Sequence, residues 1–397
     1  MEIARLQFQL GQHSNAVEYA ERAVKTFPNH RYVVRSFACL LSTIGESEKA
    51  LYYLRKSESF RWDPWVQSAE VAISSSIKKS TKLSKARLQH IRSLRSADKN
   101  MTELAAGLAT IETESGNRKT AKHLLELSMS SPNENSLAQL RWLQQNKNLA
   151  PLVQPNIFVD NASEANVYDS IKLENPTLAV AQAEIWQMDQ PFLSQSALIG
   201  SSLCLSVLDE PSRALKIVDR ALIAQPNDLS LHNNRFVGLV LNGQINEAND
   251  LFNERLKTKR LGEYEPFTYA ALGLMAFAKG KCDDGRGFYL EAMKSASKNK
   301  NPDLVVTAFI YWIGREFSCK QISNSDAVQL IETLEKKLEK QNSVLKRNSM
   351  ALATIRRRVS AANSSPPLAI ASEIKKTADT SYNLLNAAVA NETHGDV

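Results

Sequence analysis

The chain has 397 residues, of which 43% are hydrophobic and 23% are charged, with a formal net charge of +7. This balance is typical of a protein with a buried core and a solvated surface, and no run approaches the roughly 18–20 apolar residues that a membrane-spanning helix needs. The first twelve residues mix charged, polar and apolar side chains, which excludes a secretory signal peptide there. We therefore predict a cytoplasmic protein without membrane insertion.

The cysteines and histidines form no metal or disulfide pattern. The four cysteines are far apart and include no C-x-x-C pair, and the six histidines include no H-x-x-x-H pair. Scattered thiols are typical of a reducing compartment. We expect neither a structural metal nor a cofactor.

Charge is distributed unevenly along the chain. Residues 1–150 contain 22 Lys and Arg against 14 Asp and Glu, residues 151–330 contain 17 against 21, and residues 331–397 contain 10 against 7. The first part is therefore basic, at +8, and the middle part is acidic, at −4. This asymmetry favours an acidic partner for residues 1–100, although it does not specify nucleic acid.

An alanine recurs along the chain with the period of a helical hairpin. The recurring positions are Ala16, Ala50, Ala86, Ala121, Ala179, Ala214 and Ala248. The steps between them are 34, 36, 35, 58, 35 and 34 residues. Internal periods of this length indicate a solenoid of stacked helical hairpins.

The first unit shows the local pattern. Gly11 falls where one helix ends and positive φ is useful, and Pro28 ends the next helix. Between them, Ala16, Ala20 and Ala23 form a stripe of small side chains that lets the second helix approach its neighbours closely. This pattern resembles the tetratricopeptide repeat, and the resemblance covers roughly residues 1–340. It implies an all-α, right-handed α-solenoid of helix-turn-helix repeats.

The later units set the predicted domain boundaries. We expect an N-terminal array with a capping helix over 1–148, a linker over 149–161, a C-terminal array over 162–340, a helical cap over 341–390 and a disordered tail over 391–397. Met1 falls inside the first helix of the first unit, which favours a chain that begins within a longer protein.

The third unit departs from the pattern. It has no turn glycine; its first helix is expected over about 65–77, and its second helix should turn Leu83, Ala86 and Leu94 inward.

Enzyme signatures are absent from the sequence. It contains no phosphate-binding glycine loop, no H-E-x-x-H and no G-x-S-x-G. The segment most similar to a binding site is GKCDDGRG at 280–287, where Cys282, Asp283 and Asp284 could bind a cation. The alternating oxygen ligands of a calcium loop do not continue, so an inter-helix turn with a capping aspartate is favoured. We predict a non-catalytic protein.

The most basic stretch is 71–97, which contains no acidic residue. Its cations are Lys78, Lys79, Lys82, Lys85, Arg87, Arg92 and Arg95. One interpretation is a basic face for phosphates or an acidic peptide, formed by Lys82, Lys85, Arg92 and Arg95. The other is the solvated outer face of a helix. No aromatic residues are interleaved for base stacking. The arginine run at 356–358 has the same two interpretations.

The family resemblance implies that the first helix of each hairpin lines a concave groove. The candidates that it assigns to this groove are Tyr32, Arg35, Lys78, Lys79, Ser230, Asn233 and Val237. The lysine and asparagine set with which some members clamp a C-terminal carboxylate has no match here. Four aromatic residues of the second array either line an apolar groove or pack between units: Phe267, Tyr269, Phe277 and Phe288.

The predicted function is that of a non-catalytic scaffold or adaptor, which binds a peptide or protein partner in the concave groove. Two alternatives stay open. One is a nucleic-acid-associated regulator that uses the basic face at 78–95. The other is a sensory or regulatory array that controls an effector.

Overall fold

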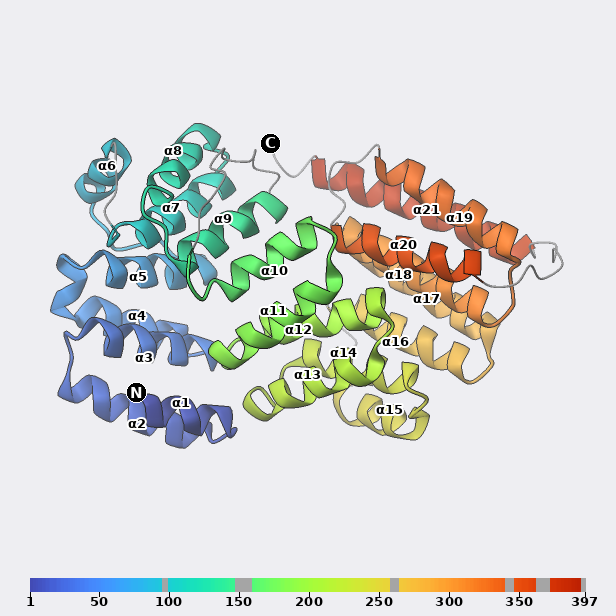
Figure 1. Ribbon diagram of the computed structural model, residues 1–397, viewed down its shortest axis with the longest axis horizontal. Helices are drawn as coiled ribbons and strands as arrows, with labels where there is room; N and C mark the ends of the chain where they lie inside the picture. Colours follow the sequence, from blue (N-terminus) through green and yellow to red (C-terminus); the bar gives the residue numbers. More distant parts are fainter. Residues whose placement is uncertain (95–98, 147–158, 258–263, 340–345, 362–371, 394–397) are drawn as a thin grey trace. The chain divides into compact units, whose positions relative to one another are not determined.

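The computed structural model describes most of the chain (Figure 1). The described residues are 1–94, 99–146, 159–257, 264–339, 346–361 and 372–393. Within these ranges every regular element is a helix, so the all-α prediction is confirmed. None of these helices combines the length and the apolar character that a membrane crossing needs. The chain divides into two compact units.

Unit 1 comprises Met1–Leu173, Ala181–Ser196 and Ile223–Pro226. Its helices are α1 (Glu2–Gln9), α2 (His13–Thr26), α3 (Arg31–Thr43), α4 (Ser47–Lys56), η1 (Glu58–Arg61), α5 (Pro64–Ser76), α6 (Lys85–Ser93), α7 (Thr102–Glu114), α8 (Arg118–Ser128), α9 (Glu134–Asn146) and α10 (Ser163–Lys172). Three further helices contribute residues to both units: α11 (Pro176–Asp189), α12 (Gln195–Leu203) and α13 (Pro211–Ala224).

Unit 2 comprises Glu174–Val180, Ala197–Leu222 and Asn227–Val397. Its further elements are the π-helical segment η2 (Cys204–Leu208), α14 (Leu229–Leu241), α15 (Ile245–Leu251), the π-helical segment η3 (Phe252–Leu256), α16 (Glu265–Ala278), α17 (Cys282–Lys298), α18 (Pro302–Ser318), α19 (Asn324–Glu339), α20 (Lys346–Ala361) and α21 (Ser372–Thr393).

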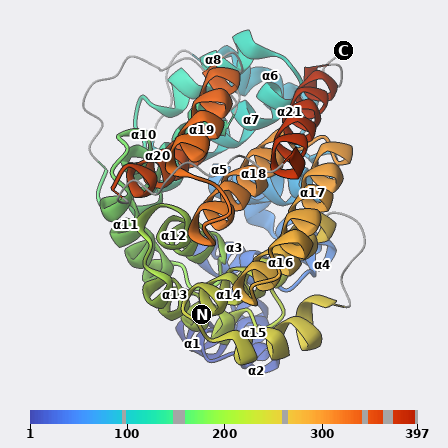
Figure 2. The ribbon, with the colours of Figure 1, turned by 90° about the vertical axis from the view of Figure 1, so that its right-hand side faces the viewer.

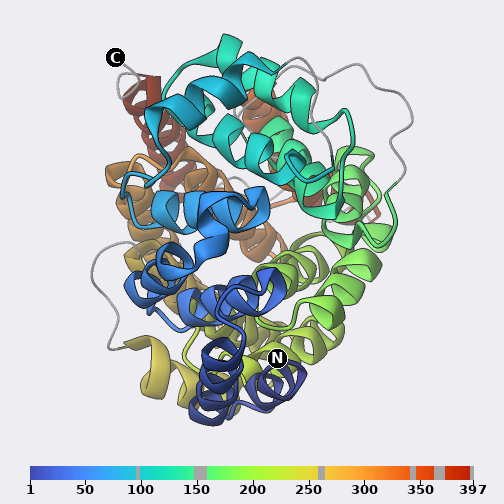
Figure 3. The same ribbon diagram turned by 90° about the vertical axis from the view of Figure 1, so that its left-hand side faces the viewer.

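Consecutive helices of unit 1 pack in pairs, α1 with α2, α3 with α4 and α7 with α8 (Figure 3). Glycines at positive φ join them, as at Gly11 (φ +73°) and Gly45 (φ +87°). Gly11 is doubly constrained, because a Cβ there would lie 2.6 Å from the carbonyl oxygen of Ile223. Glycine is therefore required at this turn both for its backbone conformation and for its small size.

Six of the seven periodic alanines are completely buried. They are Ala16, Ala50, Ala121, Ala179, Ala214 and Ala248. In each case the missing side-chain volume lets a neighbouring helix approach closely. Ala86, the seventh, is exposed, so the prediction that it faces inward is wrong.

The third hairpin predicted from the alanine period corresponds to α5 and α6, and these two helices do not form a regular pair. α5 packs on α3, α4 and α7, whereas α6 packs on α8. After α5 the chain turns at Lys78 (φ +55°) and runs without regular structure to Ser84, whose hydroxyl caps α6. Only Ile91 of α6 is buried, and Leu83 and Leu94 lie outside the helix, half-buried. The alanine period therefore does not set the packing of this helix.

In unit 2, α16 and α17 cross at very short range. A Cβ at Gly273 would lie 2.8 Å from the Tyr289 ring, and a Cβ at Gly285 would lie 2.5 Å from the Phe277 ring. This close contact explains why position 285 carries glycine, since any side chain there would collide with the Phe277 ring. α21 packs on α17 and α18 (Figure 2).

Several predicted segments fall wholly or partly outside the described residues. Of the predicted linker at 149–161, only 159–161 are described. In the predicted cap at 341–390, the structure has α20 and α21, and α21 continues to Thr393. The last four residues of the predicted tail, 394–397, are not described.

Candidate functional site

An uncharged cavity, here called the unit 2 cavity, lies among the helices of unit 2. Its volume is about 280 Å³, and residues of α12, η2, α14, α16, α17, α18 and α20 form its wall. The lining side chains are aliphatic, aromatic, hydroxyl or carboxamide groups, with no carboxylate, ammonium or guanidinium among them. A cavity of roughly 150 Å³ holds benzene, so this one has room for a ligand with larger apolar groups.

α14 contributes one face to the cavity. Its first turn is capped by the carboxylate of Asp228, which accepts hydrogen bonds from the backbone N–H groups of Ser230 (2.9 Å) and Leu231 (3.0 Å). With the helix start fixed there, Ser230, Asn233 and Val237 follow the i, i+3, i+7 spacing of one helix face. The structure places these three residues, which the family resemblance assigned to a groove, in the wall of the cavity.

α16 and α18 provide most of the apolar wall. Phe267, Ala270 and Leu274 of α16 repeat the i, i+3, i+7 spacing, and α18 contributes five lining residues. Phe267 is 37% exposed. The other three aromatic candidates do not line the cavity, and Phe277 is buried in the core beside Tyr289. The presence of an aromatic residue in this segment therefore does not tell whether it lines the cavity or packs in the core.

α20 completes the cavity with Asn348 and Ala351, both nearly fully buried. The helix packs on η2, α18 and α19. The Thr354 hydroxyl donates to the carbonyl oxygen of Val207 in η2 at 3.0 Å. The segment that the sequence analysis predicted as a cap thus supplies part of the cavity wall.

The Asn233 carboxamide in the wall has no protein partner among the described residues. The amide of Asn234 donates to the Ser201 hydroxyl at 2.9 Å, and the Thr307 hydroxyl donates to the Asp303 carbonyl at 2.7 Å. The neighbouring Asn233 is half-buried, and its carboxamide makes no such bond with any described residue. A carboxamide offers both donors and an acceptor, which match the C=O and N–H of a peptide group.

Tyr32 and Arg35, two of the groove candidates of unit 1, are engaged with other side chains. The Tyr32 hydroxyl donates to Glu2, and this hydrogen bond, followed by partial burial, raises the pKa of Tyr32. Arg35 pairs with the buried Glu103 at 2.6 Å and lies over the Trp65 ring, 5.0 Å from its centroid. Arg35 therefore has a structural role that the sequence did not indicate.

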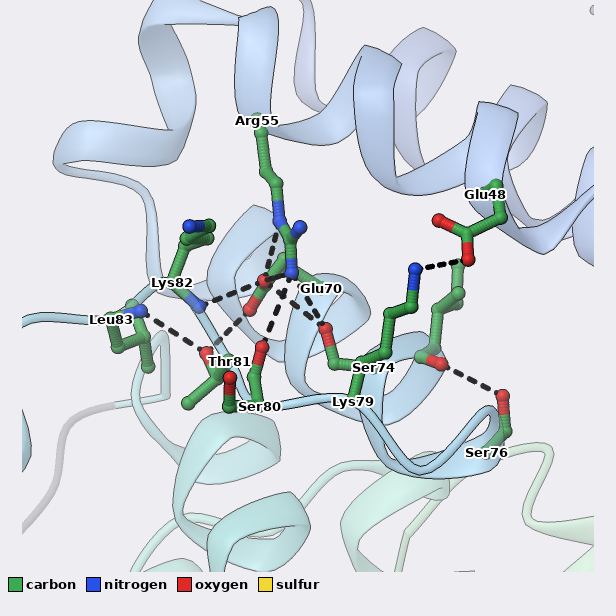
Figure 4. Close-up of polar contacts among 11 residues, drawn as sticks. Glu48, Arg55, Glu70, Ser74, Ser76, Lys79, Ser80, Thr81, Lys82 and Leu83 are labelled. Carbon is green, nitrogen blue, oxygen red and sulfur yellow. Dashed lines mark hydrogen bonds and ion pairs between the residues drawn. The ribbon is translucent and has the colours of Figure 1, made fainter.

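The loop between α5 and α6 is built around a buried carboxylate (Figure 4). Glu70 accepts hydrogen bonds from the Arg55 guanidinium at 2.6 and 2.9 Å, from the Thr81 hydroxyl at 2.5 Å and from the backbone N–H of Lys82 at 3.0 Å. The Ser74 hydroxyl donates to it as well, at 3.2 Å. These bonds fix the path of the basic segment.

The predicted basic face is only partly available. Arg92 pairs with Glu112, and Lys79 pairs with Glu48. Lys78, Lys82 and Lys85 are exposed, and no acidic side chain of the described chain pairs with them. Arg95 lies outside the described residues.

Most of the segment 280–287 is the start of α17, whose N-cap residue is Lys281 without a side-chain cap, so the prediction of a capping aspartate is wrong. The segment holds an ion pair. Asp283, in the first turn of α17, pairs with Arg286 at 2.8 Å. No group of three or more His, Cys, Asp or Glu side chains in the described ranges is arranged to hold a metal ion.

Glu164, in α10, gives the stability of the protein a pH dependence. Burial raises the pKa of Glu164 to about 7, whereas an unfolded glutamate titrates near 4.3. Between these values the folded chain retains a proton that the unfolded chain has lost, so the contribution of Glu164 to stability falls as the pH rises through this window.

We expect Glu164→Gln to exceed the wild type in free energy of unfolding by about 1 kcal/mol at pH 5 and by about 3 kcal/mol at pH 8. Urea unfolding at the two pH values measures the difference. An equal gain at both pH values would show that ionisation of Glu164 is not its cause.

No family model and no curated protein matches the chain. The geometry of the unit 2 cavity and of the basic segment is therefore the basis for assigning a function.

Proposed function

We propose that the protein is a tetratricopeptide-like, right-handed helical solenoid that acts as a non-catalytic scaffold or adaptor. In this proposal the first helices of successive hairpins form a concave surface, and a partner protein inserts an uncharged segment of its chain into the unit 2 cavity. The observation on which the proposal depends is that cavity, with its charge-free wall and the unpartnered carboxamide of Asn233.

The repeat pattern supports the proposed architecture. The turn glycines precede completely buried alanines by five residues, as Gly11 precedes Ala16 and Gly243 precedes Ala248. α12, α14, α16 and α18 are the first helices of successive hairpins, and all four line the cavity. In the tetratricopeptide arrangement, first helices line the groove that receives a partner.

The chemistry of the wall supports a polypeptide ligand. A charged ligand would lose its hydration without gaining an opposite charge, which is costly. An apolar side chain would gain from burial among Phe267, Leu274 and their neighbours. The peptide group beside it would find both a donor and an acceptor in Asn233.

The test is affinity capture with the tagged full-length chain from its native cell, with and without nuclease. The variant Ala270→Trp places an indole in the cavity wall, and Ala278→Trp places the same group at an exposed position of the same helix. We expect a nuclease-resistant protein that the wild type and Ala278→Trp recover and that Ala270→Trp recovers at least tenfold less. Circular dichroism confirms that each variant is folded, and Asn233→Ala serves as a second, milder variant.

A partner recovered equally by Ala270→Trp, Asn233→Ala and the wild type would exclude the unit 2 cavity as the binding site. Recovery that disappears with nuclease would favour the nucleic-acid alternative. The observation behind that alternative is the exposed set Lys78, Lys82 and Lys85, which would also suit an acidic partner. In that case binding should weaken steeply with salt and with replacement of these lysines.

A further inference from the structure

Two cysteines that are far apart in the sequence lie against the same turn of unit 2. Cys282 is the first residue of α17, and Cys319 directly follows α18. The Cys282 thiol donates to the carbonyl oxygen of Gly280 at 3.8 Å, and the Cys319 thiol donates to that of Phe277 at 3.9 Å. Phe277 lies in the last turn of α16, and Gly280 lies in the turn that joins α16 to α17.

The carbonyl oxygens that accept from the two thiols are only three residues apart in the chain, so both thiols lie at the same place in unit 2. Burial raises the pKa of Cys319, and the neighbouring Cys282 raises it further. Both cysteines are free and partly exposed, so a small oxidant can reach them. Of the other two cysteines, Cys39 is exposed and Cys204 is buried.

We propose that Cys282 and Cys319 form a redox-sensitive dithiol, which hydrogen peroxide converts to an intramolecular disulfide that links the start of α17 to the end of α18. One thiolate attacks peroxide to give a sulfenic acid and hydroxide. The second thiol then displaces the sulfenic oxygen as water, so that two thiols and one peroxide yield one disulfide and two waters. A dithiol reductant reverses the reaction.

The disulfide would close a loop across two helices that pack on each other and both line the unit 2 cavity. Closing the loop restricts the unfolded chain and stabilises the pair of helices. Oxidation should therefore raise the midpoint of thermal unfolding, by roughly 5–15 °C if the full effect of a native disulfide is realised. This proposal does not depend on the proposed function, since it concerns chemistry within the chain.

The test uses the purified full-length chain, which has four cysteines. After treatment with hydrogen peroxide and removal of the excess, thiols are counted with a colorimetric disulfide reagent in denaturant. We expect the count to fall from four to two and to return to four with dithiothreitol. Intact mass should fall by about 2 Da, and non-reducing peptide mapping should join the peptides that contain Cys282 and Cys319.

Single replacements give the controls. Cys39→Ser should leave the loss of two thiols unchanged, whereas Cys282→Ser and Cys319→Ser should each abolish the intramolecular link. Because mapping reads the bond directly, a change in fold cannot produce the expected link. A count that stays at four, a mass gain from sulfinic acid at one sulfur, or a dimer linked through Cys39 would each overturn the proposal.

Discussion

Replacing Glu316 with alanine is expected to lower the free energy of unfolding of unit 2 by about 3–5 kcal/mol. Glu316 is completely buried, and Arg286 donates to its two oxygens at 2.7 and 3.2 Å. The indole N–H of Trp312 donates to the same carboxylate at 2.8 Å. The substitution removes the buried counter-charge of a buried guanidinium and leaves the Trp312 N–H without this acceptor, which costs far more than the loss of an exposed pair.

Asp283→Ala is the matched control, because Asp283 pairs with the same Arg286 at 2.8 Å but its side chain is 86% exposed. It should cost at most about 1 kcal/mol. Urea unfolding gives the free energies, and hydrogen exchange by peptide should locate the lost protection in α17 and α18. A double replacement, Arg286→Met with Glu316→Leu, should recover most of the loss. Equal effects of Glu316→Ala and Asp283→Ala would refute the assignment.

The helical architecture could be predicted because it depends on local features. A glycine followed by an alanine five residues later marks a turn and a close helix contact in one short segment, and both follow from backbone conformation and side-chain size. Ala86 shows the limit of this logic. An alanine at the right spacing does not face inward when the helix before it ends in an irregular loop.

Only some of the residues that line the unit 2 cavity could be predicted from the sequence. Ser230, Asn233 and Val237 were assigned by register, since they share a face of a first helix with a clear start. The contribution of α20 depends on packing between segments about 150 residues apart, as in the bond from Thr354 to Val207, and no local pattern encodes it. The same holds for Glu70 and Glu103. Both appear in the sequence as ordinary acidic residues, and only the fold reveals them as buried partners of Arg55 and Arg35.

Glu70→Ala is expected to lower the free energy of unfolding of unit 1 by about 3–5 kcal/mol. The carboxylate is completely buried and bonds the Arg55 guanidinium, the Thr81 hydroxyl and the backbone N–H of Lys82 (Figure 4). Its removal leaves the partly buried Arg55 guanidinium without its counter-charge. It also removes the hydrogen bonds that hold the loop before α6. Trypsin should therefore cut after Lys78 and Lys82 several-fold faster in the folded variant than in the wild type.

Glu48→Ala provides the contrast, because Glu48 pairs with Lys79 on the same loop while both side chains are at least half exposed. Its expected cost is below about 1 kcal/mol, with little change in cleavage of the loop. Both variants remove one carboxylate near the same loop, so a difference in their free energies of unfolding reports the effect of burying that carboxylate.

If the lysines of this loop also bind an acidic partner, Glu70→Ala should weaken that binding by disordering them. Glu48→Ala should strengthen it by freeing Lys79. Opposite signs in one binding assay would separate the positioning of the basic segment from its charge.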